Sequence, residues 1–321
     1  MLLNQIIPVK TPLIGGPMYP CSNPELIAAI SNAGGLGIIQ PMTLEFVFNY
    51  PLAEGIDYIR TLTDQPIGLN LILETSSKKY IKRTEKWLQI AIEKEIPFLI
   101  TALGDPTWVV EKVKTNNIIV FHDVINKRHA AKASNAGVNG LICVNNLAGG
   151  HTGQKSPAEL FKELGEFDKP KICAGGVSDS TTFTEMLEIG YAGCQLGTRF
   201  IASTECSAHN DYKQSIVQAT VNDIVLSEKI TGIPVSVINT DYIKKQGVKA
   251  TGLPKWLLNN HFAKHWVRTV YSVISVFKLK KSLKKGGLYK KFFQAGKSVH
   301  AIDSVSSVQE IIDNITSNTE S

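Results

Sequence analysis

The chain has 321 residues, of which 43% are hydrophobic and 19% charged, so it has material for a large core and is not disordered by composition. Its five cysteines, odd in number and without a Cys-x-x-Cys pair, argue against a disulfide framework or a zinc knuckle and favour a reducing, cytoplasmic location. The net charge of +6 is concentrated near the end, because no acidic residue lies between Asp241 and Asp303. The first residues lack the pattern of an export signal.

Short apolar runs alternate with amphipathic stretches from residue 12 to residue 200, as in repeated βα units around a buried parallel sheet. Eight strands are predicted, at residues 12–18, 36–40, 67–73, 98–103, 118–124, 140–145, 171–177 and 192–200. Helices are expected at 24–32, 78–93 and 179–188, and no long helix within 41–66. The count indicates one (β/α)₈ TIM barrel in residues 1–240, followed by a basic, largely helical extension in 241–321 that packs on it and ends in a few disordered residues.

A doubly wound open sheet is the alternative fold. It would normally carry a Gly-x-Gly-x-x-Gly turn after its first strand. This chain has GGPMYPCSNP there, and Pro17 and Pro20 remove amide donors that a pyrophosphate would need.

Glycines follow the seventh and eighth predicted strands, where TIM barrels commonly bind phosphate. The segments are Ala174-Gly175-Gly176-Val177 and Gln195-Leu196-Gly197-Thr198. Glycine lets a phosphate approach backbone amides, the helix start after Ser178 adds a favourable dipole end, and Thr198 adds a hydroxyl. We predict that these loops bind a mononucleotide phosphate; tight turns without a ligand are the alternative.

The sixth strand is followed by Ala148-Gly149-Gly150-His151-Thr152-Gly153, a lone histidine flanked by glycines. Such a backbone can pass beneath a flat ligand, and imidazole exchanges protons near neutral pH. His151 is therefore predicted to be a catalytic base, with a loop-bracing role as the alternative.

Other polar residues carry weaker signals. His122 ends the fifth strand and either points into the pocket or pairs structurally with Asp123. Asn70 interrupts an apolar strand and is predicted to bind a cofactor edge, with backbone bonding inside the barrel as the alternative. No histidines or carboxylates have convincing metal-ligand spacing, so no metal is expected, and the Gly-x-Ser-x-Gly elbow of a hydrolase is missing.

Several segments taken in order resemble the nitronate monooxygenase family, formerly called 2-nitropropane dioxygenases. They are TPLIGGPMYPCSNPELIAAISNAGGLGII, AGGHTG, CAGGV and GYAGCQLGTRFIASTEC, and the likeness covers roughly residues 8–240. The resemblance implies an FMN-dependent oxidoreductase that oxidises alkyl nitronates or nitroalkanes with O2. By this resemblance His151 is the catalytic histidine, Pro17, Met18, Asn70, Gly149 and Gly150 adjoin the flavin, and Gly175, Gly176, Gln195, Leu196, Gly197 and Thr198 hold its phosphate.

The resemblance is incomplete at one place and leaves alternatives. Many members read roughly Q-G-x-E-A-G-G-H where this chain has Val144 and Leu147, so Asn145 or Asn146 is expected to substitute. The later segment FFQAGKSV resembles a C-terminal flavin-site segment, which would return the tail to the barrel mouth. An NAD(P)H-dependent reductase of the enoyl-acyl carrier protein or quinone type is the nearest rival, and a flavin-binding protein without turnover is the third reading.

The tail adds its own expectations. Trp266 to Phe277 have near-helical apolar spacing and predict an amphipathic helix too short to span a membrane. The lysines of residues 278–291 are either a solvated face or a peripheral contact for an anionic surface or an acidic protein. The expected partners are a small-molecule substrate and O2, and no nucleic acid is expected.

Overall fold

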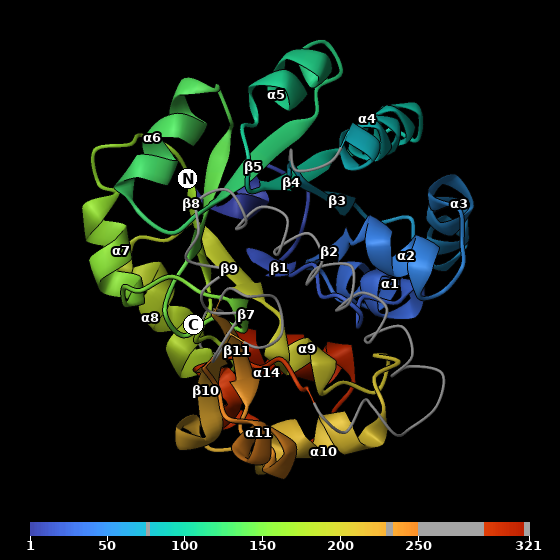
Figure 1. Cartoon of the computed structure of the whole chain (residues 1–321). Coiled ribbons are helices and arrows are strands. Elements are labelled where there is room, and N and C mark those ends of the chain that lie inside the picture. Colours follow the sequence, from blue (N-terminus) through green and yellow to red (C-terminus); the bar gives the residue numbers. More distant parts are fainter. Residues whose placement is uncertain (75–77, 229–233, 250–291, 318–321) are drawn as a thin grey trace.

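Eight parallel strands form a closed barrel in the computed structural model, which describes residues 1–74, 78–228, 234–249 and 292–317 (Figure 1). In barrel order the strands are β1 (Leu13–Gly15), β2 (Leu36–Ile39), β3 (Ile67–Ile72), β4 (Phe98–Ala102), β5 (Ile119–Val124), β6 (Gly140–Val144), β8 (Lys171–Ala174) and β9 (Gly193–Leu196). The barrel closes between β9 and β1, where Gln195 pairs with Ile14. All eight strands lie inside their predicted ranges, so the TIM-barrel prediction is confirmed.

Helices follow most of the strands and cover the outside of the barrel (Figure 1). They are α1 (Pro24–Asn32), α2 (Pro41–Phe46), α3 (Leu52–Leu62), α4 (Lys78–Glu93), α5 (Thr107–Val113), α6 (Lys127–Asn135), α7 (Pro157–Glu163), α8 (Ser180–Ile189) and α9 (Thr198–Ile201). The helices expected at 24–32 and 78–93 have the predicted bounds. The third begins one residue late, because Asp179 is its N-cap and its side chain accepts the amide hydrogen of Thr182.

The expectation of no long helix in residues 41–66 was wrong. This stretch contains α2 and the eleven-residue α3. Two of its three prolines begin helices rather than interrupt them: Pro41 is the first residue of α2, and Pro51 is the N-cap of α3. A proline at a helix start loses no intrahelical hydrogen bond.

Side chains along the strands alternate between two cores. Outward residues pack against the helices, while inward residues such as Ile38, Phe98 and Phe121 form a separate cluster inside the barrel. The short helix η1 (Leu3–Gln5) closes one end of this interior with Leu3, whose amide donates to the Ala192 carbonyl at 2.7 Å. Ala192 directly precedes β9, so η1 covers the amino end and leaves the carboxyl ends for the site.

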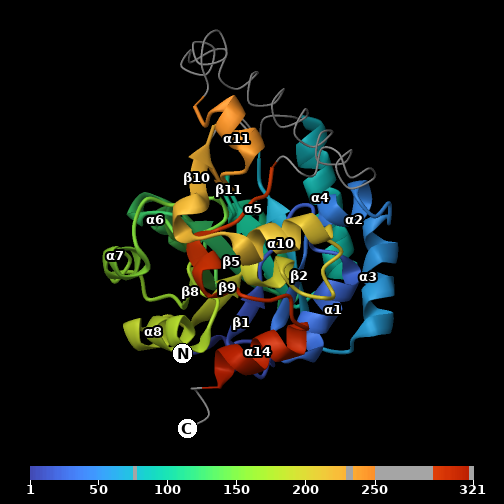
Figure 2. The same ribbon diagram turned by 90° about the horizontal axis from the view of Figure 1, so that it is seen from below.

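A small antiparallel sheet stands beyond the carboxyl ends of the strands. It consists of β10 (Ile224–Ser227), β11 (Val235–Ile238) and the two-residue strand β7 (Gly150–His151). The remaining elements are α10 (Asn210–Gln218), η2 (Val221–Asp223), α11 (Asp241–Gln246), η4 (Lys297–Ala301) and α14 (Val308–Thr316). Figure 2 shows β10, β11 and α11 at the end of the molecule away from the N-terminus.

The C-terminal part of the described chain packs on the barrel. Helix α14 contacts α8 and α1, and Gln294 forms a bridge with Val237 of β11. The predicted amphipathic helix at residues 266–277, the lysine-rich stretch 278–291 and the last residues 318–321 lie outside the described residues. Within the described ranges, the structure contains no helix of the length and apolarity needed to span a membrane.

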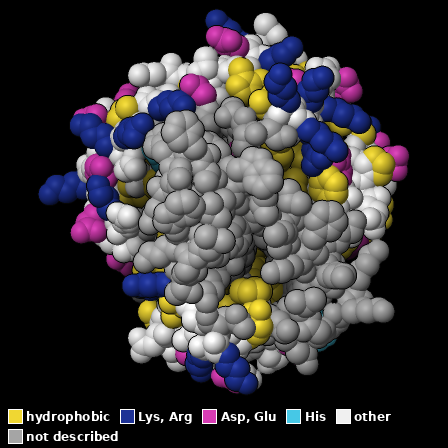
Figure 3. Space-filling model, viewed as in Figure 1, with side chains coloured by type: hydrophobic (Ala, Val, Ile, Leu, Met, Phe, Trp, Pro, Cys, Tyr) yellow, Lys and Arg dark blue, Asp and Glu magenta, His cyan; other side chains and the backbone are white. Residues whose placement is uncertain are grey.

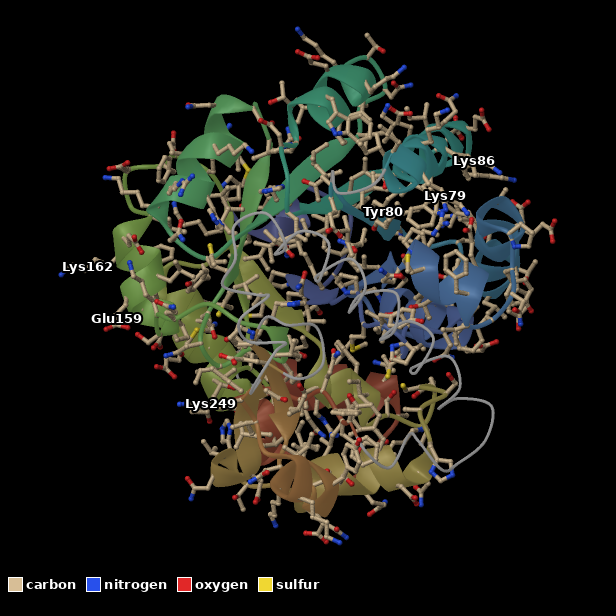
Figure 4. The ribbon with its side chains drawn as sticks, viewed as in Figure 1. Lys79, Tyr80, Lys86, Glu159, Lys162 and Lys249 are labelled. Carbon is tan, nitrogen blue, oxygen red and sulfur yellow. The ribbon has the colours of Figure 1, made fainter. Side chains whose placement is uncertain are left out.

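Positive charge is also found on the barrel itself. Helix α4 carries a group of basic residues, and Lys and Arg side chains gather on the corresponding part of the rim in Figure 3. Figure 4 shows Lys79 and Lys86 pointing outward from α4, while Tyr80 points toward the centre of the view. On the opposite rim α7 presents Glu159 and Lys162, charges of both signs. The excess of positive charge still belongs to the tail, because residues 241–321 contain 14 Lys and Arg against 5 Asp and Glu, whereas residues 1–240 contain 20 against 23.

Candidate active site

The loop after β8 has a backbone that only glycine adopts readily. Gly175 and Gly176 have φ values of +114° and +89°. A Cβ on Gly175 would lie 2.5 Å from the backbone nitrogen of Ala148, and one on Gly176 would lie 2.7 Å from a methyl carbon of Leu147. The loops after β8 and β6 therefore meet in direct contact, as the barrel topology requires of neighbouring strands.

The end of β9 meets both the first loop and the C-terminal segment. The Met18 sulfur is 3.5 Å from the position of a Cβ on Gly197. The Gly296 amide donates to the Thr198 hydroxyl oxygen at 2.9 Å, and a Cβ on Gly149 would lie 2.9 Å from the same amide nitrogen. The return of the FFQAGKSV segment to the barrel mouth is thus confirmed. Because a hydroxyl accepts and donates, Thr198 can still donate its own hydrogen to an anion.

Asn70, Asp123 and Gln195 point into the barrel. Asn70 and Gln195 are each flanked in their strands by residues of the outer core, and Asp123 precedes the outer-core residue Val124 and is two residues from the inward-facing Phe121. One amide hydrogen of Asn70 bonds to the Ile100 carbonyl at 3.2 Å, the backbone interaction that was the alternative to a cofactor contact. An amide has a second hydrogen and an oxygen, so this bond leaves Asn70 able to bind a ligand.

His122 takes neither of its two expected positions. Its ring points outward from β5, and Nδ1 lies 2.8 Å from the Thr101 hydroxyl oxygen. Burial lowers the pKa of His122 to about 4, so the ring is neutral at pH 7. Asp123, which was considered only as its partner, instead faces the barrel interior. Strand alternation from Phe121 predicts this placement, and the sequence interpretation missed it.

His151 lies in β7, where it pairs with Val235 of β11. Its side chain is exposed at the mouth, yet nearby protein atoms desolvate the imidazole and lower its pKa below the ordinary value. The ring is therefore neutral at pH 7 and can accept a proton. Gly150, with φ of +68°, sets the turn that brings the histidine into this short strand.

Asn145 is a structural clamp. Its side-chain amide donates to the Gly175 carbonyl at 2.9 Å, and its side-chain oxygen accepts the Leu147 amide at 2.8 Å. The residue is fully buried. Asn145 therefore holds the loops after β6 and β8 together, whereas Asn146 keeps a buried side-chain oxygen without a partner in the described structure.

The start of α8 offers less to an anion than the sequence indicated. The Asp179 carboxylate caps this helix by accepting from Thr182 and already occupies its positive end. The amides of the glycine loops and the Thr198 hydroxyl are the remaining donors. Within the described ranges, no group of three or more His, Cys, Asp or Glu residues could hold a metal ion.

Two observations test whether a flavin mononucleotide fits here. The glycines of the loops after β6 and β8 have no side chain that could screen their backbone amides from a ligand, and their close packing admits none. Gln195 and Ser178, beside these loops, each have a buried side-chain oxygen without a partner among the described residues. Buried polar atoms are rarely left unpaired, so a ligand with donors and acceptors suits this mouth. The residues present therefore fit FMN.

Comparison with known proteins agrees with this fit. The family model described as nitronate monooxygenase matches residues 1–318. A Rhodococcus jostii protein named (3aS,4S,5R,7aS)-5-hydroxy-7a-methyl-1-oxo-octahydro-1H-indene-4-carboxyl-CoA dehydrogenase is 26% identical, covering 98% of this chain and 94% of its own. A probable nitronate monooxygenase of Staphylococcus saprophyticus is 28% identical, covering 79% of this chain and 83% of its own.

Two solved structures share the fold. FabK from Thermotoga maritima has a TM-score of 0.81 at 27% identity, covering 99% of this chain and 95% of its own. A nitroalkane oxidase from Streptomyces ansochromogenes has a TM-score of 0.79 at 19% identity, covering 98% of this chain and 97% of its own, and at that identity it supports the fold alone.

The barrel and its glycine-lined mouth define an FMN-dependent oxidoreductase. Within that class, the match over residues 1–318 shows that the chain belongs to the nitronate monooxygenase family.

Proposed function

We propose that the protein oxidises alkyl nitronates, or the neutral nitroalkanes from which they form, with molecular oxygen. Bound FMN supplies the two-electron redox chemistry and the reaction with oxygen. The observation that carries the proposal is His151, a neutral imidazole at the mouth of a barrel of this family. The Staphylococcus saprophyticus relative, named as a probable nitronate monooxygenase, supports the same reaction.

His151 would act as the proton acceptor. A neutral nitroalkane must lose an α-proton before oxidation, and a positioned imidazole contributes on the order of 10²–10⁴-fold to such a step. A nitronate has already lost that proton, so His151 would orient it instead. The antiparallel pairing with Val235 restricts where the imidazole can reach.

The flavin contacts are proposed residue by residue. Pro17, Met18, Asn70, Gly149 and Gly150 would adjoin the ring system. Gly175, Gly176, Gln195, Leu196, Gly197 and Thr198 would hold the phosphate. The positive φ values of Gly175 and Gly176 and the unpaired oxygen of Gln195 support this division.

Reduction of an acyl thioester or a related acceptor by NAD(P)H is the second candidate. The coenzyme A thioester in the name of the Rhodococcus relative, a dehydrogenase, favours this class of substrate, and the near-complete overlap with FabK favours the reductase scaffold. The two candidates differ in what delivers electrons to the flavin.

Anaerobic flavin bleaching separates them. FMN-loaded protein is mixed with propionate 3-nitronate or ethyl nitronate in one cuvette and with NADH or NADPH in another. Bleaching by nitronate alone, with oxygen uptake in air, is the expected result. Bleaching by NAD(P)H alone would replace the proposal with the reductase, and no bleaching by either would favour a flavin-binding protein without turnover.

A further inference from the structure

Asp123 is a carboxylic acid in an unusual place. It lies near the carboxyl end of β5 and faces the barrel interior, on the same side as Ile119 and Phe121. One of its carboxyl oxygens is buried and has no hydrogen-bond partner in the described structure. The residue as a whole is half-buried, so the unpaired atom is this one oxygen, and a buried oxygen without a partner costs folding free energy.

The inward-facing side chains beside Asp123 on β4 and β6 are all apolar. On the adjacent strands, inward positions are filled by Ile100 and Ala102 of β4 and by Ile142 and Val144 of β6. Asp123 pairs with Ile142 in register. A ligand that bonds to Asp123 would therefore approach from above the strands, on the face where TIM barrels place their active sites.

The charged groups packed against β5 lie on its other side. Helix α6 covers the outer face with Lys127, Arg128, His129 and Lys132. Cys143, which points outward from β6, interacts electrostatically with Asp123. Burial raises the pKa of the Cys143 thiol and keeps it neutral. The side chain of Asp123 thus has no counter-ion among the described residues.

We propose that the Asp123 carboxyl donates a hydrogen bond to a ring acceptor of the bound flavin. The pyrimidine part of the isoalloxazine ring presents two carbonyl oxygens and ring nitrogens, which are mainly acceptors. A neutral carboxylic acid has one O–H to give them, whereas a carboxylate could only accept. This role rests on FMN binding and is independent of whether nitronate or NAD(P)H reduces the flavin.

The protonation state agrees with a donor. Burial raises the pKa of Asp123 to about 7 in the protein without a ligand. An acceptor placed on the O–H would raise this pKa further. The affinity for FMN should therefore be highest at pH values below about 7. Between this pH and the higher pKa of the complex, the affinity should fall by about tenfold per pH unit.

The test is FMN affinity as a function of pH. Apoprotein is titrated with FMN between pH 6 and 9, and binding is followed by quenching of flavin fluorescence. The same titration is made with Asp123→Asn, Asp123→Leu and the control Asp168→Asn, which removes an exposed carboxyl at the amino end of β8. The phosphate of FMN titrates in every variant, so the ratio of dissociation constants between wild type and Asp123→Asn isolates the carboxyl.

The amide of Asp123→Asn keeps a donor and cannot titrate, so this variant should bind FMN with an affinity that no longer falls above pH 7. Asp123→Leu should bind more than tenfold more weakly at pH 6.5. Wild type that binds more tightly as the pH rises would mean that a carboxylate accepts from the flavin, and this result would overturn the proposal. Equal affinity of wild type and Asp123→Leu at pH 6.5 would also overturn it.

Thermal unfolding of the apoprotein shows whether a variant binds FMN weakly because it folds poorly or because it lacks the carboxyl. If Asp123 is retained for the ligand, Asp123→Leu should melt at a higher temperature than wild type at pH 8 without FMN, because it removes a buried unpaired carboxylate. FMN should then raise the melting temperature of wild type more than that of the variant. A lower apoprotein melting temperature for Asp123→Leu would show that the carboxyl supports the fold, contrary to the proposal.

Discussion

The backbone amide of Gly296 donates a hydrogen bond of 2.9 Å to the side-chain oxygen of Thr198, almost one hundred residues earlier in the chain. This bond joins the C-terminal segment to the loop after β9. It also holds a hydroxyl that we propose to bind the flavin phosphate. One side chain therefore couples the tail to the candidate cofactor site.

Replacing Thr198 by Val should weaken both functions of this side chain. The Gly296 amide is left buried without an acceptor, which costs about 1–3 kcal/mol. We expect a lower melting temperature and FMN binding at least tenfold weaker, measured by fluorescence titration. Thr198→Ser keeps the hydroxyl and should stay close to wild type; loss of affinity in the serine variant as well would point to the methyl group instead.

Replacing His151 by Asn should separate catalysis from cofactor binding. We expect FMN to remain bound with an unchanged visible spectrum, while kcat/KM for a neutral nitroalkane falls about 10²–10⁴-fold. Oxidation of the preformed nitronate should fall less, because it needs no proton acceptor. Equal losses for the two substrates would contradict the role of a base.

The rate with neutral nitroalkane should depend on pH in a defined direction. Desolvation lowers the pKa of His151, so the basic form persists to lower pH than for a free histidine. kcat/KM should therefore be constant near neutral pH and decline only on acidification through the lowered pKa. A decline that begins above pH 7 would assign the base to another group.

Two glycine substitutions test how tightly the loops meet. Gly150 and Gly175 both have positive φ, but a Cβ on Gly150 has its nearest neighbour at 3.6 Å and one on Gly175 would lie 2.5 Å from backbone. Gly150→Ala should cost about 1–2 kcal/mol of unfolding free energy from backbone strain alone. Gly175→Ala adds overpacking of about 1–3 kcal/mol and should also weaken FMN binding. Urea unfolding measures the difference, and equal costs would speak against the close contact.

His122 should make the protein sensitive to acid. Burial lowers its pKa to about 4 in the folded chain, so below the unfolded value of about 6.5 the unfolded chain binds the extra proton. Stability should fall as the pH drops from about 6.5 to 4, by at most about 1.4 kcal/mol per pH unit. His122→Gln should flatten this decline, whereas the exposed control His300→Gln should not. Urea unfolding at pH 7, 6 and 5 makes the comparison.

The barrel could be predicted from the sequence. Short continuous apolar runs with glycines or helix caps at their ends indicate buried parallel strands, and eight of them in order leave little choice of topology. The sequence also indicated the glycine loops and His151, because a positive φ and a proton acceptor each require particular residue types. The pairing of β7 with β11 could not be predicted from the sequence, because a two-residue strand is too short to show a hydrophobic pattern.

Tertiary structure decided which way the polar side chains face and what they meet. His122 and Asp123 are adjacent and equally polar, yet one turns to Thr101 outside the barrel and the other to the interior. The bond between Thr198 and Gly296, and the clamp that Asn145 makes between two loops, join residues far apart in the chain. Such contacts depend on the register and closure of the whole barrel, which a local sequence pattern does not encode.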